Sequence, residues 1–515
     1  MLDKKESPPV EKLGSAEKEI QGTLENTSIE YTWAEQFREL KKSRRTVCAA
    51  LACSSAAVLV GYDMTLIGSI IANSEFIEHF GTYDHGIQQW TLPANYQLIW
   101  SIVQYIAAIA GAVGVGFLND VFGRRICFFV IISLTLIGTA VELVSPGWKV
   151  WNVAKLLMGV AMGFMQANTP SYVSELSPVS IRGFMLSLFQ FWINLGSFIG
   201  ACVLEGTSTI VGGWSWKAAI ASQFGLCAFC LLVFIPLVPE SPFYLVRHHQ
   251  PEKARAVLLR LRANEPGYSV DLELETIRET LDQELRASTE APSYLDCFRG
   301  TDLRRTLIAV LPMVMQGFSG YSLCGNYLAY FLTMSGVSDA FVITVISMLC
   351  AIFATLLSFI LVEKIGRRPQ LLTGCAGMLT CLLAIGIIGC VNYPSRGSGI
   401  AVATFCIIWS IFYYLSVGAV GWTIVGEISS TRLRAKTTSL AAAMNSLFNM
   451  AFSIAIPYLI NANEANLGPK TGFVFFAPFV LFAVIAFFTI PETKKLSFQE
   501  LNYKFETRMP ARKFQ

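Results

Sequence analysis

Twelve long apolar runs constrain this chain more than any other feature. An α-helix rises about 1.5 Å per residue, so about 20 apolar residues span the hydrocarbon core of a bilayer. Six runs precede a polar central stretch and six follow it. The runs occupy residues 46–72, 95–118, 126–144, 151–173, 184–206, 217–238, 306–334, 340–362, 370–391, 399–425, 437–461 and 472–490. They predict an all-α membrane protein with twelve transmembrane helices.

The composition excludes a soluble globular protein. Of the 515 residues, 53% are hydrophobic and 15% are charged, whereas soluble domains carry roughly 25% charged residues. The formal net charge of +3 is too small to favour binding to nucleic acid. We therefore expect a multi-pass protein of a lipid bilayer with no nucleic-acid partner.

The polar segments divide the chain into five expected domains. The N-terminal residues lack the apolar core of a signal peptide, and the pattern from Tyr31 to Arg45 suits a helix on the membrane surface. In the central stretch, Pro251 begins an amphipathic helical pattern, and a second pattern covers residues 272–286. The expected domains are a tail at 1–45, a six-helix bundle at 46–238, a helical linker at 239–305, a six-helix bundle at 306–490 and a tail at 491–515.

Lys and Arg predict the orientation in the membrane. If the N-terminus is cytosolic, the inside segments hold residues 41–45, the central linker, the C-terminal tail and most other basic residues. The outside segments hold little beyond Lys149, Lys217, Arg396 and Lys470. This asymmetry is the positive-inside pattern. We expect both termini to be cytosolic.

Three short motifs occur twice. Each falls after the second, fourth or sixth run of its half, in the same order and after nearly the same interval, which indicates a duplicated six-helix unit in parallel topology. The pairs are Gly123-Arg124-Arg125 with Gly366-Arg367-Arg368, Glu175 and Arg182 with Glu427 and Arg434, and Pro239-Glu240-Ser241 with Pro491-Glu492-Thr493.

Asp63 is the only charged residue in the first apolar run. A carboxylate at membrane depth is costly and usually faces a cavity or a partner. It is either a structurally paired acid or a site for a proton or a substrate.

The sequence offers no pattern for catalysis or metal binding. All four His lie outside the apolar runs, and Cys227 and Cys230 form a C-x-x-C inside one, where thiols behave as small hydrophobes. There is no nucleophile–base pair and no G-x-x-x-x-G-K-[ST] loop. We expect no metal, no cofactor, no enzyme activity and no ATP-driven pump.

The paired motifs resemble those of the sugar porter family of the major facilitator superfamily, from about Gly61 to Leu501. The stretches beginning at Gly61, Lys155 and Gln316 are most similar to the fungal α-glucoside permease branch. The resemblance implies the major facilitator fold, with two parallel six-helix bundles, and transport by alternating access.

The resemblance also implies a cytosolic gate whose acids and guanidinium groups tie the two bundles together. The alternative is that these charges only mark the cytosolic boundary. The gate residues would be Asp120, Arg124, Arg125, Glu175, Arg182, Glu240, Glu363, Arg367, Arg368, Glu427, Arg434 and Glu492.

The resemblance also implies a sugar site made of amides and an aromatic ring. This chain departs from hexose porters at Gly317 and Ser446, which lack larger side chains, and at Ser322, while Asn326 adds an amide one turn further on. These changes favour a ligand larger than, or differently shaped from, glucose. Any single buried amide is also ordinary packing between helices. The expected substrate residues are Gln190, Gln316, Ser322, Asn326, Trp422 and Asn445.

Proton coupling is expected to rest on Asp63 and Lys155. In proton-coupled members of the family an acid on the first span faces an Arg on the fourth, and Lys155 matches that position here. An acid that gains or loses a cationic partner during the cycle can bind and release a proton. Some facilitators carry the same acid, and Val60 stands where certain α-glucoside symporters have a second one.

We therefore expect a secondary active transporter that functions as a monomer and imports a sugar by proton symport across the plasma membrane. The sugar would be an α-glucoside or disaccharide, or a related hexose or polyol. A facilitated-diffusion uniporter and an exporter of a sugar-like or secondary metabolite remain alternatives. The short segment after the last run disfavours a nutrient sensor. The expected partners are the sugar, protons and the lipid bilayer.

Overall fold

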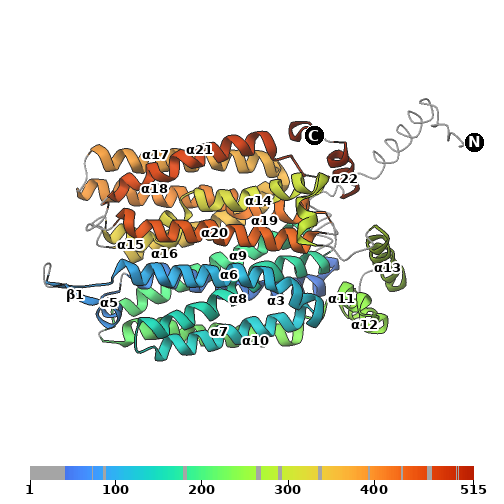
Figure 1. Cartoon of the computed structure of the whole chain (residues 1–515), viewed down its shortest axis with the longest axis horizontal. Helices are drawn as coiled ribbons and strands as arrows, with labels where there is room; N and C mark the ends of the chain where they lie inside the picture. The colour runs from blue at the N-terminus through green and yellow to red at the C-terminus, as the bar shows by residue number, and fades with distance from the viewer. Residues whose placement is uncertain are drawn as a thin grey trace, which may run out of the picture.

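The computed structural model is almost entirely helical (Figure 1). It describes residues 41–71, 73–84, 88–177, 182–210, 212–262, 268–287, 293–334, 339–391, 395–430, 433–460, 465, 467–494, 496, 498–507 and 509–514. The surface helix predicted from Tyr31 to Arg45 lies mostly outside these residues.

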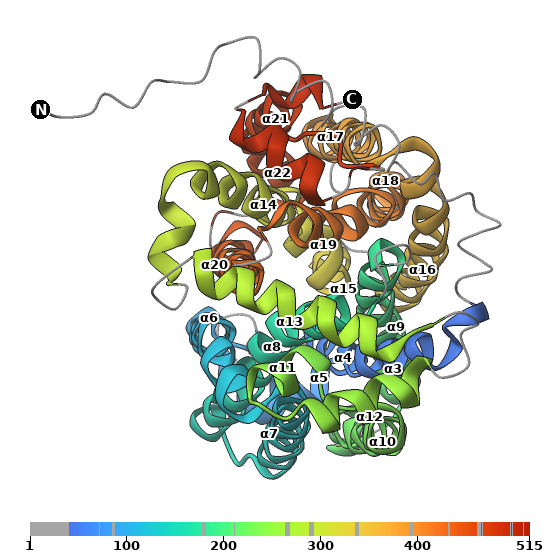
Figure 2. The same ribbon diagram turned by 90° about the vertical axis from the view of Figure 1, so that its right-hand side faces the viewer.

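The helices fall into two groups that lie side by side (Figure 2). The first half contains α3 (Arg44–Ser55), α4 (Ala57–Ile70), α5 (Ser74–Phe80), β1 (Thr82–Asp84), β2 (Gln89–Thr91), α6 (Ala94–Phe122), α7 (Arg124–Val144), α8 (Trp148–Leu176), α9 (Arg182–Ser208) and α10 (Trp214–Leu237). The central segment contains α11 (Pro242–Arg247), α12 (Pro251–Arg262), α13 (Val270–Ala287) and η2 (Tyr294–Phe298). The second half contains α14 (Gly300–Phe318), η3 (Ser322–Asn326), α15 (Leu328–Met334), α16 (Ala340–Ile365), α17 (Arg367–Val391), α18 (Arg396–Leu415), α19 (Val417–Ile428), α20 (Arg434–Ile460), η4 (Gly468–Lys470) and α21 (Thr471–Thr489), followed by α22 (Phe498–Glu506) and η5 (Ala511–Lys513).

All twelve predicted spans are helical, and both helices predicted in the central stretch are present as α12 and α13. By length and composition, ten helical stretches among the described residues could cross a membrane. The other two predicted spans are α8, which carries Lys155 and many polar residues, and α14 with α15, which are separated by an irregular turn. The all-α prediction is confirmed, while the domain boundaries stay a prediction.

The irregular points of the spans are local breaks in the helices. The first span bends at Ala56 between α3 and α4. The tenth breaks at Ser416, whose φ and ψ are −126° and −98°. The seventh passes through η3, a short π-helical turn that frees backbone groups inside the bundle. Such turns are tolerated at membrane depth where they are buried in protein.

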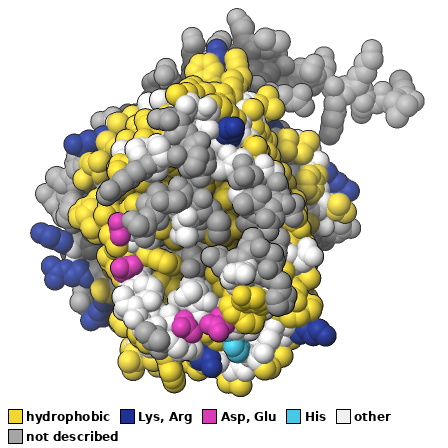
Figure 3. All heavy atoms as spheres, turned by 90° about the vertical axis from the view of Figure 1, so that its left-hand side faces the viewer, with side chains coloured by type: hydrophobic (Ala, Val, Ile, Leu, Met, Phe, Trp, Pro, Cys, Tyr) yellow, Lys and Arg dark blue, Asp and Glu magenta, His cyan; other side chains and the backbone are white. Residues whose placement is uncertain are grey.

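The two ends of the molecule differ (Figure 1). At the hairpin end, β1 pairs with β2, and Tyr83 faces Trp90 across the ladder. Acidic side chains and a histidine are visible on this face (Figure 3). The opposite end, here called the charged end, carries α11, α12, α13 and α22.

An aromatic cap covers the first half at its hairpin end. We define it as Phe76, Phe80, Trp100, Trp151 and Trp216. Phe76 is fully buried, and its ring centroid lies 5.3 Å from that of Trp151 and 5.7 Å from that of Trp216. Edge-to-face rings at such distances are favourable. The cap therefore holds α5 against α6, α8 and α10.

Close packing within and between the halves depends on glycines. A Cβ added at Gly61 of α4 would lie 1.9 Å from the carbonyl oxygen of Ile193 on α9, within the first half. A Cβ added at Gly68 would lie 1.9 Å from the carbonyl oxygen of Asn326 in η3, across the two halves. The halves also meet where α6 packs on α20 and α9 packs on α16. The described arrangement is thus closed between α4 and η3.

Gly61→Ala should destabilise the first half. Overpacking a close helix contact costs about 1–3 kcal/mol, so we expect a lower melting temperature for the purified protein. Gly225→Ala on α10 is the matched control, because a Cβ there meets nothing within 4 Å. Equal melting temperatures for the two variants would contradict this packing.

Candidate functional site

A buried cluster of three charged side chains lies inside the first half. Asp63 comes from α4, Glu142 from α7 and Lys155 from α8. The Lys155 Nζ lies 2.6 Å from Glu142 Oε1 and 3.6 Å from Asp63 Oδ1. The three residues are 5%, 1% and 2% exposed, respectively. The predicted partnership of Asp63 with Lys155 thus has a matching geometry, and a second acid shares the same lysine.

Two further groups contact this cluster. The Gln104 amide on α6 donates a hydrogen bond to Asp63 Oδ2 at 2.8 Å. The Lys155 Nζ also lies over the Trp151 ring of the aromatic cap, 5.0 Å from its centroid. Buried charges need such partners because transfer out of water is costly.

Glu142 was not predicted. It is the only charged residue of the apolar run 126–144, and an acid near a helix end suggests contact with the membrane surface. The signal that could have found it is the presence of an acid inside a run at all.

A small cavity lies between the halves, beside the charged cluster. Its polar lining comes from Ser101, Gln104 and Tyr105 of α6 and from Asn326, Tyr327 and Ser453 of the second half. The predicted substrate residue Asn326 therefore faces this cavity. Gln104 belongs to both features, since it lines the cavity and binds Asp63.

Two predicted amides meet in the second half. Asn445 Nδ2 donates to Gln316 Oε1 at 2.9 Å, and Gln316 Nε2 donates to the carbonyl oxygen of Val417 at 3.2 Å. Asn449, one turn along α20, donates to Asn445 Oδ1 at 3.1 Å. This chain of amides was predicted only in part, because Asn449 was missed.

The other predicted residues lie apart from those amides. Gln190 donates to Asn194 on the same helix, and Asn194 donates to Thr355 Oγ1 across the halves at 2.6 Å. The Trp422 ring packs edge-on against Phe189, 5.5 Å between centroids. These contacts join α9 to α16 and α19, so Gln190 and Trp422 lie where the two halves touch.

Two departures from the hexose pattern have a structural explanation. A Cβ added at Gly317 would lie 2.7 Å from the Cβ of Phe448, so a neighbouring side chain fills that space. The absence of a side chain at Gly317 thus makes room for Phe448, and the expected ligand size stays a prediction. The Ser322 Oγ is buried in η3 and has no hydrogen-bond partner among the described residues.

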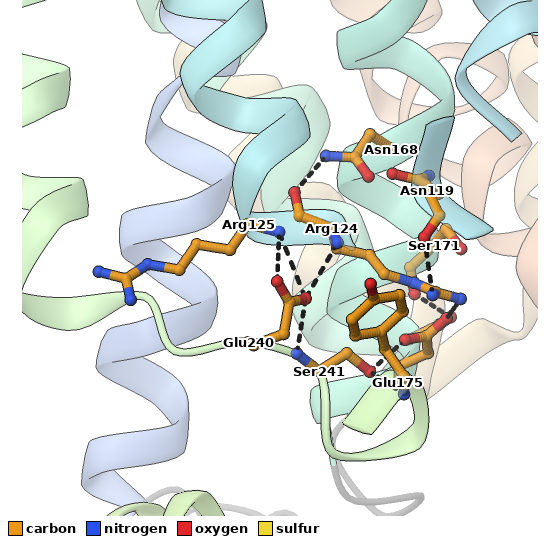
Figure 4. A network of polar contacts seen from close by, with 10 residues as sticks. Asn119, Arg124, Arg125, Asn168, Ser171, Glu175, Glu240 and Ser241 are labelled. Atoms are coloured by element: carbon orange, nitrogen blue, oxygen red, sulfur yellow. Dashed lines mark hydrogen bonds and ion pairs between the residues drawn. The ribbon is translucent and has the colours of Figure 1, made fainter. Parts of the chain in front are cut away.

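A polar network closes the charged end of the first half (Figure 4). Arg124 Nη2 lies 3.0 Å from Glu175 Oε1, and Ser241 Oγ donates to the other oxygen of Glu175. The Glu240 carboxylate accepts the backbone N–H of Arg124 and of Arg125, at 2.9 Å and 3.2 Å. Burial raises the pKa of the Glu240 carboxyl, and the backbone donors oppose that shift.

The second half repeats this network residue by residue. Arg367 lies 2.8 Å from Glu427 Oε1 and also donates to its other oxygen. Thr493 Oγ1 donates to Glu427 at 2.6 Å. Glu492 accepts the backbone N–H of Arg367 and of Arg368. The duplication read from the sequence is therefore a duplication of contacts.

Glycine is needed at the start of both networks. Gly123 and Gly366 have φ of 88° and 101°, a conformation that glycine adopts without strain. A Cβ at either position would lie 2.6 Å from the acid of the sixth-span motif, Glu240 or Glu492. The G-R-R motif thus places a sharp turn, two backbone donors and an arginine around one carboxylate.

These pairs differ in one respect from the expected gate. Every pair in these two networks joins elements of the same half, because the loops after spans two, four and six of one unit are neighbours. Asp120 and Arg182 lie in α6 and α9, and Glu363 and Arg434 in α16 and α20. The side chains of Asp120, Arg182 and Glu363 lie outside the described residues.

The chain matches proteins of known family over most of its length. The family model described as "Sugar (and other) transporter" matches residues 48–505. The MFS transporter fmqE of Aspergillus fumigatus is 30% identical, covering 88% of this chain and 84% of the relative. In Saccharomyces cerevisiae, the low-affinity glucose transporter HXT1 is 27% identical (89% of this chain, 81% of the relative) and the general alpha-glucoside permease is 28% identical (92% and 77%).

A solved structure shows the same fold. The proton:xylose symporter XylE of E. coli is 22% identical and has a TM-score of 0.73, covering 90% of this chain and 100% of the other. The similar identities to a glucose transporter and to an α-glucoside permease do not single out the maltose-type branch. With the family model matching most of the chain, the protein belongs to the sugar porter family of the major facilitator superfamily, whose members are membrane transporters and not enzymes.

Proposed function

We propose that this protein imports a sugar across the plasma membrane by proton symport, with the charged end and both termini in the cytosol. The observation that carries the proposal is the link made by Gln104 between Asp63 and the cavity. A sugar hydroxyl in the cavity and a carboxylate on Asp63 compete for the same amide. Sugar binding and proton binding can therefore influence each other.

Alternating access would couple the contacts of the sugar to the protonation of Asp63. Asp63 and Gln104 belong to the first half, whereas Asn326 and the Gln316–Asn445 amides belong to the second. When the halves rock about the cavity, the sugar contacts of one half move relative to the acid of the other. Such a geometry lets protonation of Asp63 accompany closure around the sugar.

The proposed substrate is an α-glucoside or disaccharide, or a related hexose or polyol. Polyhydroxylated ligands need several donors and acceptors inside an otherwise apolar site, and the buried amides supply both. The relatives of this chain include a low-affinity glucose transporter and a general α-glucoside permease, which supports this range.

Asp63→Asn should abolish accumulation of the sugar. The amide keeps the shape of the carboxyl but cannot take up a proton. In transporter-null cells given labelled glucose, maltose or a polyol, we expect uptake by the parent to collapse with a protonophore. The variant should lose at least about tenfold in accumulation and become insensitive to the protonophore.

Asp271→Asn, an exposed acid on α13, is the matched control for that substitution and should transport like the parent. Uptake by the parent that ignores both the protonophore and Asp63→Asn would instead indicate a facilitator. No uptake of any sugar would favour an exporter.

Gln316→Ala should weaken sugar binding. The substitution removes an amide that would donate to and accept from sugar hydroxyls, and a buried hydroxyl left unmatched costs about 1–3 kcal/mol. We expect KM to rise about tenfold or more, at 1.4 kcal/mol per factor of ten. Gln223→Ala on α10 removes a buried amide away from the cavity, where Gln223 accepts from Thr139. An equal change in KM for both variants would argue against a substrate role for Gln316.

We also propose that the networks at the charged end keep each half rigid during transport. The ion pairs of each network lie within one half, so the loss of a pair should destabilise that half. Glu427→Gln removes an acid paired with Arg367, and breaking a buried pair costs about 3–5 kcal/mol. We expect a clearly lower melting temperature of the purified protein. Glu273→Gln breaks the Arg262–Glu273 pair between α12 and α13, outside the spans, and is the control. A latch between the halves would instead open the charged end to thiol reagents with an unchanged melting temperature.

A further inference from the structure

We propose that Glu142 is the standing partner of Lys155, and that this pairing leaves Asp63 free to take up and release the transported proton. Glu142 is thus a positioning residue that acts on Asp63 through the lysine. The inference rests on the proton symport proposed above.

The distances distinguish the two acids. Lys155 Nζ lies 2.6 Å from Glu142 Oε1 but 3.6 Å from Asp63 Oδ1. Glu142 is the most enclosed of the three residues, at 1% exposure. Asp63 instead accepts a hydrogen bond from the neutral Gln104 amide, and it also lines a second small cavity. The lysine therefore belongs chiefly to Glu142, and Asp63 is the acid with access to a cavity.

The charge of the cluster requires a proton. With all three groups ionised, the cluster would carry a net charge of −1 inside the membrane, where an unpaired buried charge is very costly. A proton on Asp63 removes that excess and leaves the Lys155–Glu142 pair neutral. Two acids that share one cation thus hold one proton between them.

Two tyrosines are the other titratable side chains that the structure places near the cluster. They are Tyr105 of α6 and Tyr327 beside η3. Tyr62 on the same helix points away, and its hydroxyl donates to the carbonyl oxygen of Ala219 on α10. Changes at Glu142 should therefore reach Asp63 through Lys155.

Removing the Glu142 charge has a predictable sign. In Glu142→Gln the lysine loses its close anion and pairs with Asp63, which favours the ionised carboxylate. A higher proton concentration is then needed to protonate Asp63. The pH at which sugar uptake is half-maximal should fall by about one unit, a tenfold change in proton concentration.

The test uses the full chain in proteoliposomes, with sugar uptake measured across a range of external pH. We expect Glu142→Gln to lower the half-maximal pH and Glu142→Asp, which keeps the charge, to stay with the parent. Sugar counterflow is the control for folding. This exchange of sugar for sugar requires no net release of protons, so a folded variant should still carry it out. The double substitution Glu142→Gln with Lys155→Met removes both charges of the pair and should return the midpoint toward that of the parent.

An unchanged or raised midpoint in Glu142→Gln would overturn the inference, as would a double variant that keeps the lowered midpoint. If Glu142→Gln does not fold, the double variant, in which Asp63 is the one remaining ionisable group of the three, decides the question, and a midpoint below that of the parent would overturn the inference. Failure of the symport proposal looks different, because uptake by the parent itself would then be independent of pH and of Asp63→Asn.

Discussion

The fold depends on one constraint, that a charge inside the bilayer must be matched within the protein. Lys155 would be costly on α8 alone, and so would Asp63 on α4 or Glu142 on α7. Together their opposite charges largely cancel, and Gln104 and Trp151 supply the remaining contacts. The packing of α4, α6, α7 and α8 is therefore fixed by polar contacts as well as by apolar surface, which lipid tails could cover equally well.

The same constraint acts at the charged end through a different device. There the carboxylates are held by backbone N–H groups as well as by arginines, and a glycine turn presents those donors. Because both halves use the same contacts, each is a self-contained unit. Motion between the halves then needs to break only the contacts that cross, such as Asn194 with Thr355 and Gly68 against Asn326.

Much of the fold could be predicted from the sequence, because length and hydropathy decide whether a segment spans a bilayer. All twelve predicted spans are helical, and the paired motifs were found by matching short sequences between the two halves. Contacts inside the bundle were harder. Glu142 was missed because only the packing of α7 on α8 brings it to Lys155. The neighbour that fills the space beside Gly317 is Phe448, which is far away in the sequence. The six predicted substrate residues lie in several places, since a family pattern transfers positions and not contacts.

The division of labour between the halves has a consequence for how such a protein can change. The acid cluster lies wholly in the first half, and the linked amides of Gln316, Asn445 and Asn449 lie in the second. Substitutions in α14 and α20 can therefore change the buried amides without touching the ionisable groups of α4, α7 and α8. Under the proposed symport, a change of substrate would then need substitutions in one half alone, while the charged cluster of the other half stays as it is.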